Sequence, residues 1–274
     1  MKVAAIQMVS SAHLHDNLTA ARALLRRAAE AGAELAVLPE YFCLMGQRDT
    51  DKLALQERQG TGPIQDMLAG AARDLGLWIV GGTLPLSLEP RSEHRVHNSS
   101  LAFSPAGDCV ARYDKMHLFR FHDGERTYDE AAVLEAGRAP VVFALPSRDG
   151  HLWHVALSVC YDLRFPELYR ACAAQGADLL LVPSAFTYVT GQAHWEVLLR
   201  ARAIENLAGV VAAAQGGVHE NGRRTWGHSM VIDAWGQVLA QQAEGPGVVL
   251  AELLPSEVAR RRGQLPALAH RVLS

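Results

Sequence analysis

The stretch HLWHVALSVCYDLRFPELYR, residues 151–170, joins a predicted buried strand to a predicted helix through one cysteine. Its first half, residues 152–159, is apolar and partly β-branched, which is typical of a buried strand. We expect its second half to open a helix that runs to about Ala174, because Pro166 suits a first helical turn. The tight turn can present the sulfur of Cys160, and backbone N–H groups at a helix start favour a thiolate. A buried structural cysteine is the commoner case, so this stretch alone leaves both interpretations of Cys160 open.

The composition indicates an ordinary globular protein with enough apolar residues for a large core. The 274 residues are 49% hydrophobic and 20% charged, and this length allows one large domain or two small ones. The net charge of −3 does not favour a nucleic acid or a membrane surface as a partner. We expect a first strand rather than a signal peptide at the start, because the apolar run there is short and contains Gln7.

Cysteine usage favours a reducing compartment. The four cysteines are scattered and form no C-x-x-C pair: Cys43, Cys109, Cys160 and Cys172. This spacing gives no basis for a zinc site or a disulfide framework, so we expect neither and favour the cytoplasm.

Strands and helices alternate in the first part of the chain, and hairpins are interspersed later. Asp16 is expected to cap a helix that ends near Ala31, another helix starts at Gly62-Pro63, and, beyond the helix that follows Cys160, a further one covers residues 194–207. The predicted strands cover residues 2–8, 35–38, 77–81, 98–103, 109–113, 141–145, 152–159, 178–182, 210–214, 228–233, 237–241 and 248–253. Long helices and apolar strands favour a layered α/β protein, and a doubly wound single sheet is the alternative.

Three reactive side chains each follow a predicted strand. Glu40 follows residues 35–38, Lys115 follows residues 109–113, and Cys160 follows residues 152–159. Ligand sites in α/β proteins collect beyond the carboxyl ends of strands, so a carboxylate, an ammonium and a thiol could converge there. Together they suffice for acyl transfer: a nucleophile, a proton carrier and a cation for the oxyanion. Taken singly, each charged residue is more often a solvated surface group.

The segments around these three residues resemble the active-site blocks of the nitrilase superfamily, the carbon–nitrogen hydrolases. The blocks read LPEYF at residues 38–42, YDKMHLF at 113–119 and CYDLRFPE at 160–167. The resemblance implies a four-layer α-β-β-α sandwich and one hydrolase domain over residues 1–274. It also implies a homodimer or a higher homo-oligomer.

The same resemblance assigns chemical roles. It implies that Cys160 is the nucleophile, Glu40 the general base and Lys115 the oxyanion stabiliser, with the Tyr161 backbone N–H as a second oxyanion donor. Lys115 is expected to keep the local field positive and so help Cys160 to ionise. Glu130 resembles the additional glutamate of the family and would orient the substrate or support the lysine. No metal or organic cofactor is implied, and the sequence contains no dinucleotide or Walker pattern.

The assignment of Glu130 is less specific than that of the other three residues. Glu125, Asp129 and Glu135 lie close to it in the sequence and stay alternatives.

Further residues limit the class of substrate that the site could bind. Arg164 could bind a carboxylate of the substrate, or could pair with Glu167 or Asp162. Related enzymes that act on carboxylate-bearing amides have an arginine here, which favours the binding role. Three further residues could line the acyl pocket: Phe186, Thr187 and Thr190.

The segments at residues 184–195 and 200–206 are similar to the branch that holds ω-amidases and deaminated glutathione amidases. We therefore expect an amidase that cleaves a small carboxylate-bearing amide through a thioester, with deaminated glutathione as the first choice. An ω-amidase for 2-oxoglutaramate or 2-oxosuccinamate and an N-carbamoyl amino acid hydrolase are the alternatives. A catalytically silent binding protein is the alternative that is not an enzyme.

Overall fold

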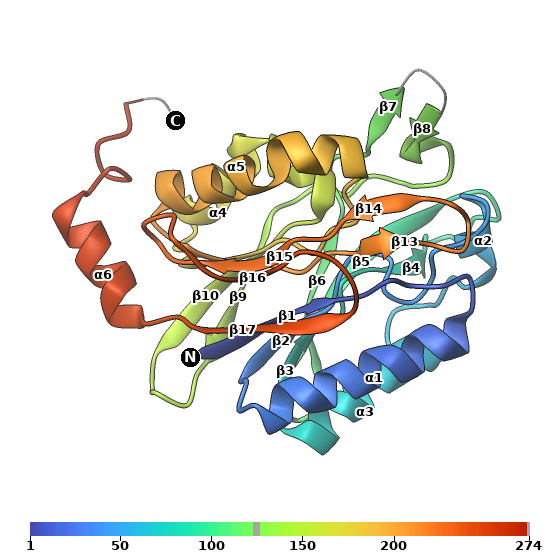
Figure 1. The fold of residues 1–274 in the computed structure, drawn as a ribbon, viewed down its shortest axis with the longest axis horizontal. Coiled ribbons are helices and arrows are strands. Elements are labelled where there is room, and N and C mark those ends of the chain that lie inside the picture. Colours follow the sequence, from blue (N-terminus) through green and yellow to red (C-terminus); the bar gives the residue numbers. More distant parts are fainter. Residues whose placement is uncertain (123–126, 273–274) are drawn as a thin grey trace.

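Two β-sheets stack face to face, and helices cover the outer face of each (Figure 1). The computed structural model describes residues 1–122 and 127–272. Helices α1 (Leu14–Glu30) and α3 (Pro63–Leu75) cover the first sheet, and α4 (Pro166–Ala174) and α5 (Tyr188–Asn206) cover the second. The order of the layers is therefore helix, sheet, sheet, helix, as the family resemblance implied.

The first sheet has seven strands and carries the segments of Glu40 and Lys115. In spatial order its strands are β17 (Gly247–Glu252), β1 (Lys2–Gln7), β2 (Leu35–Val37), β3 (Trp78–Val80), β5 (Val96–Phe103) and β4 (Leu84–Ser87), with β6 (Cys109–Asp114) also paired to β5. Strands β1, β2 and β3 run parallel, and β5 and β6 form the expected hairpin.

The second sheet has six strands and carries the cysteine. In spatial order they are β16 (Val238–Gln242), β15 (Ser229–Ile232), β12 (Gly209–Ala212), β11 (Leu179–Leu181), β10 (Leu152–Leu157) and β9 (Val141–Pro146). Strands β10, β11 and β12 are parallel, so the turns after β10 and β11 lie at the same edge of this sheet.

The remaining elements are short or peripheral. They are two small ribbons, β7 (Arg120–His122) with β8 (Thr127–Asp129) and β13 (Gly216–Val218) with β14 (Arg224–Trp226), the helices α2 (Asp51–Ala54) and α6 (Pro255–Gln264), and the 3-10 turns η1 (Glu130–Ala132) and η2 (Cys160–Arg164).

Alternation along the central strands divides the core between two interfaces. On β1, Val3 and Ala5 face the second sheet, while Ala4 and Ile6 face α1 and α3. Successive side chains of a strand point to opposite faces, so an apolar strand without polar alternation must be covered on both sides. The doubly wound single sheet that the sequence left as an alternative is therefore wrong.

Several predicted boundaries shift. Helix α1 begins at Leu14, and Asp16 lies in its first turn instead of capping it, since His13 holds the cap position. Helix α5 begins at Tyr188, six residues before the predicted start. A Cβ atom added to Gly191 would lie only 2.2 Å from Cβ of Trp226, so this glycine serves close packing inside the helix rather than a loop.

Within the described residues, no helix combines the length and the apolar character that crossing a lipid bilayer requires.

Candidate active site

Cys160 lies in a tight turn after β10, in a backbone conformation that is uncommon for a residue with a side chain. Its φ is 49°, and its N–H donates to the Pro183 carbonyl at 3.0 Å, which fixes the turn against the end of β11. The turn is a short 3-10 helix rather than the start of α4. Phe165 is extended before Pro166, because a proline disfavours the helical conformation of the residue that precedes it.

Glu40 follows β2 and is buried, with a relative exposure of 1%. Its Oε1 accepts from Nζ of Lys115 at 2.9 Å and from Nδ2 of Asn98 at 3.0 Å. Its Oε2 accepts from the backbone N–H of Ala185 at 3.0 Å, across the interface between the sheets. Three donors of fixed position hold this carboxylate in one orientation.

Lys115 follows β6 and is also 1% exposed. Its Nζ lies 2.9 Å from Oε1 of Glu40 and 2.7 Å from Oε2 of Glu130. Burial alone would lower the pKa of Lys115, but Glu130 and Glu40 outweigh burial and raise it, so the side chain is an ammonium. The pKa of Glu130 is lowered: burial opposes ionisation, and the nearby Lys115 overcomes it.

Glu130 is the acidic residue of its segment that contacts the lysine. It also accepts from the Tyr41 hydroxyl at 2.8 Å and from the Phe119 N–H at 2.7 Å. Asp129 instead caps the turn η1, and Glu135 pairs with Arg95. Glu125 lies outside the described residues.

The thiol of Cys160 is held in its neutral form. Burial and the Glu40 carboxylate raise its pKa well above the ordinary value, and Lys115 opposes this only in part. The expectation that Lys115 makes the local field positive is therefore wrong, because two carboxylates surround that single ammonium. A buried thiol beside an ionised carboxylate needs a proton acceptor as it reacts.

A narrow cavity of about 20 Å³ brings the predicted site residues together. It is lined by Glu40, Glu130, Cys160, Tyr161, Arg164, Phe186, Thr187, Thr190, Phe119, Ala185 and Arg223. Lys115 does not line this cavity, and its ammonium contacts Glu40 and Glu130, which do. The cavity thus gathers the thiol, the carboxylates and the predicted acyl-pocket residues from segments far apart in the sequence.

Arg164 contacts aromatic rings of this cavity. Its guanidinium lies 5.9 Å from the Tyr161 ring centroid and 5.4 Å from that of Phe186, and Nη1 lies 3.4 Å from Nδ1 of His194. Within the described residues it makes no ion pair with Glu167 or Asp162, so the alternative that it serves a structural ion pair is wrong. Its charge is available to a ligand.

Three supporting residues were missed by the sequence interpretation. Asn98 orients Glu40, Asp162 accepts from the Tyr113 hydroxyl at 2.7 Å, and Arg223 lines the cavity. Asn98 lies at the start of a predicted strand, but its neighbours His97, Ser99 and Ser100 are also polar, so its local sequence did not mark it. Arg223 follows a turn far from all three motifs, so nothing in its local sequence marks it.

In the described part of the chain, no group of three or more His, Cys, Asp or Glu side chains is arranged to hold a metal ion.

Comparison with known proteins assigns the family. The sequence model of the family described as Carbon-nitrogen hydrolase matches residues 2–262. A deaminated glutathione amidase from Synechocystis sp. is 41% identical over 98% of this chain and 97% of its own length. The crystal structure of the C. elegans NitFhit protein superposes with a TM-score of 0.88 at 37% identity and covers 99% of this chain and 65% of that chain.

A further solved structure is an amidase from Nesterenkonia sp. AN1 that carries acrylamide on its active-site cysteine. It covers 97% of this chain and 98% of that chain, with a TM-score of 0.78 and 30% identity. The family model, the similar sequences and the similar solved structures each match nearly the full length of this chain. The chain belongs to the carbon–nitrogen hydrolase family of the nitrilase superfamily, whose members hydrolyse carbon–nitrogen bonds.

Proposed function

We propose that this chain is a thiol-dependent amidase that hydrolyses deaminated glutathione, the 2-oxo acid analogue of glutathione. The observation that carries the proposal is that Glu40, Glu130 and the Cys160 thiol line one cavity, with the buried ammonium of Lys115 bonded to both carboxylates. The name of the relative that is 41% identical supports the choice of substrate.

In the first half of the reaction the thiol becomes acylated. Glu40 takes the proton of Cys160 as the sulfur attacks the amide carbon, which is consistent with a thiol that is neutral at rest. Lys115 and the Tyr161 N–H stabilise the tetrahedral oxyanion. The Cys160 N–H is already bonded to Pro183, so the following residue is the better placed donor. The C–N bond then breaks as Glu40 protonates the nitrogen. The dipeptide Cys-Gly departs, and the acyl group remains on Cys160 as a thioester.

In the second half, water replaces the amine. Glu40 removes a proton from the water as its oxygen attacks the thioester carbon, and the same two donors stabilise the second oxyanion. The C–S bond breaks, the thiol regains its proton from Glu40, and 2-oxoglutarate departs. Glu130 acts through Lys115, which it orients and whose pKa it helps to keep high.

Arg164 is proposed to bind the 2-oxo acid end of the substrate. A guanidinium that lines the cavity and has no carboxylate partner in the described residues matches the charge and the planar shape of such a group. Phe186, Thr187 and Thr190 would enclose the acyl chain beside it.

We further propose that the chain acts as one hydrolase domain, in the cytoplasm, as a homodimer or larger homo-oligomer. All four cysteines are free thiols, which suits a reducing compartment. Helix α5 exposes apolar side chains, with Val197 69% and Val189 65% accessible, and such a stripe suits a subunit interface.

The proposal is tested by turnover. The protein is incubated separately with deaminated glutathione, 2-oxoglutaramate and N-carbamoyl amino acids, and 2-oxo acid, ammonia and dipeptide are measured. We expect the highest kcat/KM with deaminated glutathione. Preference for 2-oxoglutaramate or for a carbamoyl compound would reassign the substrate, and no turnover of any of them would favour a silent binding protein.

A further inference from the structure

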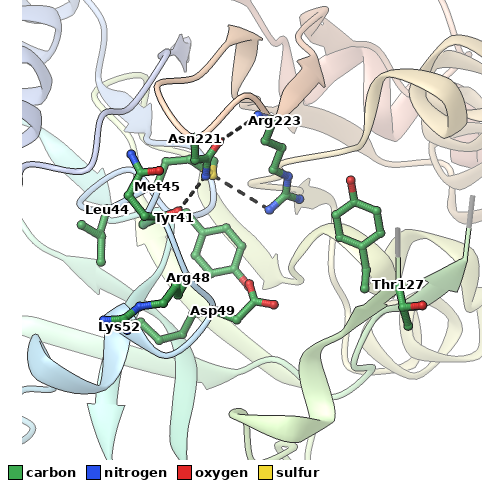
Figure 2. A pocket seen from close by; sticks show the side chains of 12 residues that line it. Tyr41, Leu44, Met45, Arg48, Asp49, Lys52, Thr127, Asn221 and Arg223 are labelled. Carbon is green, nitrogen blue, oxygen red and sulfur yellow. Dashed lines mark hydrogen bonds between the residues drawn. The ribbon is translucent and has the colours of Figure 1, made fainter. Parts of the chain in front are cut away.

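A second cavity, of about 410 Å³, lies next to the narrow one and contributes nothing to the chemistry described so far. Ligand sites in proteins commonly have volumes of roughly 300–1,000 Å³. Its lining comes from the segment after Glu40, from α2, from β8 and from the loop before β14 (Figure 2). Gln47, Arg48 and Asp49 are exposed, so the cavity opens to solvent on that side.

Arg223 joins the two cavities, because its side chain lines both. Its guanidinium donates to the Ala185 carbonyl at 3.1 Å and lies 5.7 Å from the Tyr128 ring centroid. Its Nε is buried and has no hydrogen-bond partner among the described residues, and no carboxylate of those residues forms an ion pair with it. A buried guanidinium nitrogen without a partner is costly unless a ligand satisfies it.

Lys52 is the second cation of this cavity. Its Nζ lies 4.8 Å from the Tyr41 ring centroid, and no carboxylate of the described residues is within ion-pair distance. In the view of Figure 2, the Tyr41 ring lies between Lys52 and Arg223. Burial lowers the pKa of Lys52 despite the opposing charges of Glu130 and Asp49, as expected of an ammonium that lacks a close anion.

The other charged side chains of this lining do not cancel these two cations. Arg48 is paired with Asp51 at 3.2 Å, and Asp49 lies at the exposed rim. The nearby Glu130 and Glu40 share the single ammonium of Lys115, so that cluster keeps one formal negative charge against the two cations of the cavity. The inner part of the cavity is therefore cationic.

The position of Glu40 fixes which end of a substrate would reach this cavity. In the proposed mechanism Glu40 protonates the departing nitrogen, so the amine lies on its side of the thiol. Tyr41, the next residue, lines the larger cavity, whereas Arg164 lines only the narrow one. We propose that the larger cavity binds the leaving group, an amine whose chain ends in a carboxylate, and that Lys52 and Arg223 recognise that carboxylate.

This inference rests on the proposed function and deepens it. It separates an amide of a dipeptide, which extends into the larger cavity, from a primary amide, which releases ammonia and leaves that cavity empty. Lys52 and Arg223 thus act as specificity residues that touch the leaving group, and their effect falls on KM and on binding more than on kcat.

The experiment compares deaminated glutathione with its analogue that ends in glycinamide. Binding of each compound is measured by calorimetry to the Cys160→Ala protein, which needs no turnover, and kcat and KM are measured with the active protein. We expect the carboxylate compound to bind about tenfold more tightly or better, because a partly desolvated ion pair contributes at least that much. Lys52→Met and Arg223→Gln should each reduce this preference severalfold.

Arg224→Gln is the matched control. Arg224 is the next residue, is exposed, pairs with Glu244 and lines neither cavity, so its substitution should leave the preference unchanged. Equal binding of the two compounds, or a preference that survives both Lys52→Met and Arg223→Gln, would overturn the inference. A clear binding preference without turnover of either compound would instead refute the proposed function and leave the anion site standing.

Discussion

The Tyr113 hydroxyl donates to Oδ2 of Asp162 at 2.7 Å, and this bond joins the segment of Lys115 to the turn of Cys160. Asp162 is fully buried and also accepts from the N–H groups of Val159 and His117. It therefore connects the two sheets at the point where the proposed cation and nucleophile meet.

Replacing Tyr113 by Phe should reduce activity by more than the loss of folding stability would explain. The Asp162 carboxylate would lose one of its donors, which costs about 1–3 kcal/mol. A small displacement of the cysteine turn relative to Lys115 should lower kcat roughly tenfold or more. Tyr169→Phe is the control, because the Tyr169 hydroxyl is bonded to Ser158 and no hydrogen bond joins it to Asp162 within the described residues. Thermal unfolding and kcat are compared, and equal kcat in both variants would contradict the role of Tyr113.

The assignment of the nucleophile has a direct test. Cys160→Ala should lower kcat by roughly a thousandfold or more while the protein stays folded, since no other group can form the thioester. Cys43→Ala and Cys172→Ala should keep activity, because neither thiol lines the narrow cavity. Ammonia, dipeptide and 2-oxo acid release give the rates. Loss of activity in Cys172→Ala with full retention in Cys160→Ala would show that the wrong thiol has been assigned.

Glu130→Gln should make the protein less stable at neutral pH than at acid pH, relative to the wild type. Lys115 would lose one buried ion partner, at a cost of the order of 3 kcal/mol. The folded pKa of Glu130 is lowered, so its contribution to stability is present above the unfolded value of about 4.3 and is lost as the pH falls through the folded pKa. Thermal unfolding at pH 6, 5, 4 and 3 should therefore show a difference in Tm that shrinks below about pH 4.

The control for that series is Glu93→Gln. Glu93 is exposed and forms no ion pair within the described residues, so its substitution should not change Tm at any of these pH values. A difference between wild type and Glu130→Gln that grew towards pH 3 would contradict the assigned ion pair.

Gly191→Ala should disturb the acyl pocket through packing. The added methyl group would meet Cβ of Trp226 at 2.2 Å, so α5 must move away from β14. Such overpacking costs about 2 kcal/mol, and the displaced Thr187 and Thr190 should raise KM. Gly263→Ala in α6 meets nothing within 4 Å and should be neutral or stabilising by up to about 1 kcal/mol. Unfolding by denaturant and steady-state kinetics distinguish the two variants.

The sequence predicted the strands around the site from two signals, apolar runs and turn residues. Strand β10 is apolar along most of its length, and β5 and β6 bracket the turn residues 105–108, so their existence was clear even where their ends were not. The ribbons β7–β8 and β13–β14 were missed because each strand has only three residues and little hydrophobic pattern.

Local sequence patterns could not predict contacts between residues that lie far apart in the chain. That Glu40, Lys115 and Cys160 each follow a strand was visible in the sequence, and so their convergence could be expected. The electrostatic balance could not, because it depends on how many carboxylates surround one ammonium at about 3 Å. Arg223 shows the same limit, since its importance comes from two adjoining cavities that form only in the folded chain.

The division of the site between the two sheets has a consequence for inactivation. Glu40 and Lys115 extend from one sheet and Cys160 from the other, and the Ala185–Glu40 and Tyr113–Asp162 hydrogen bonds cross the seam between them. Slight loosening of that seam would separate acid from thiol while every helix and strand persisted. Under mild heating or at low denaturant concentration, we expect enzymatic activity to fall before the circular dichroism signal changes.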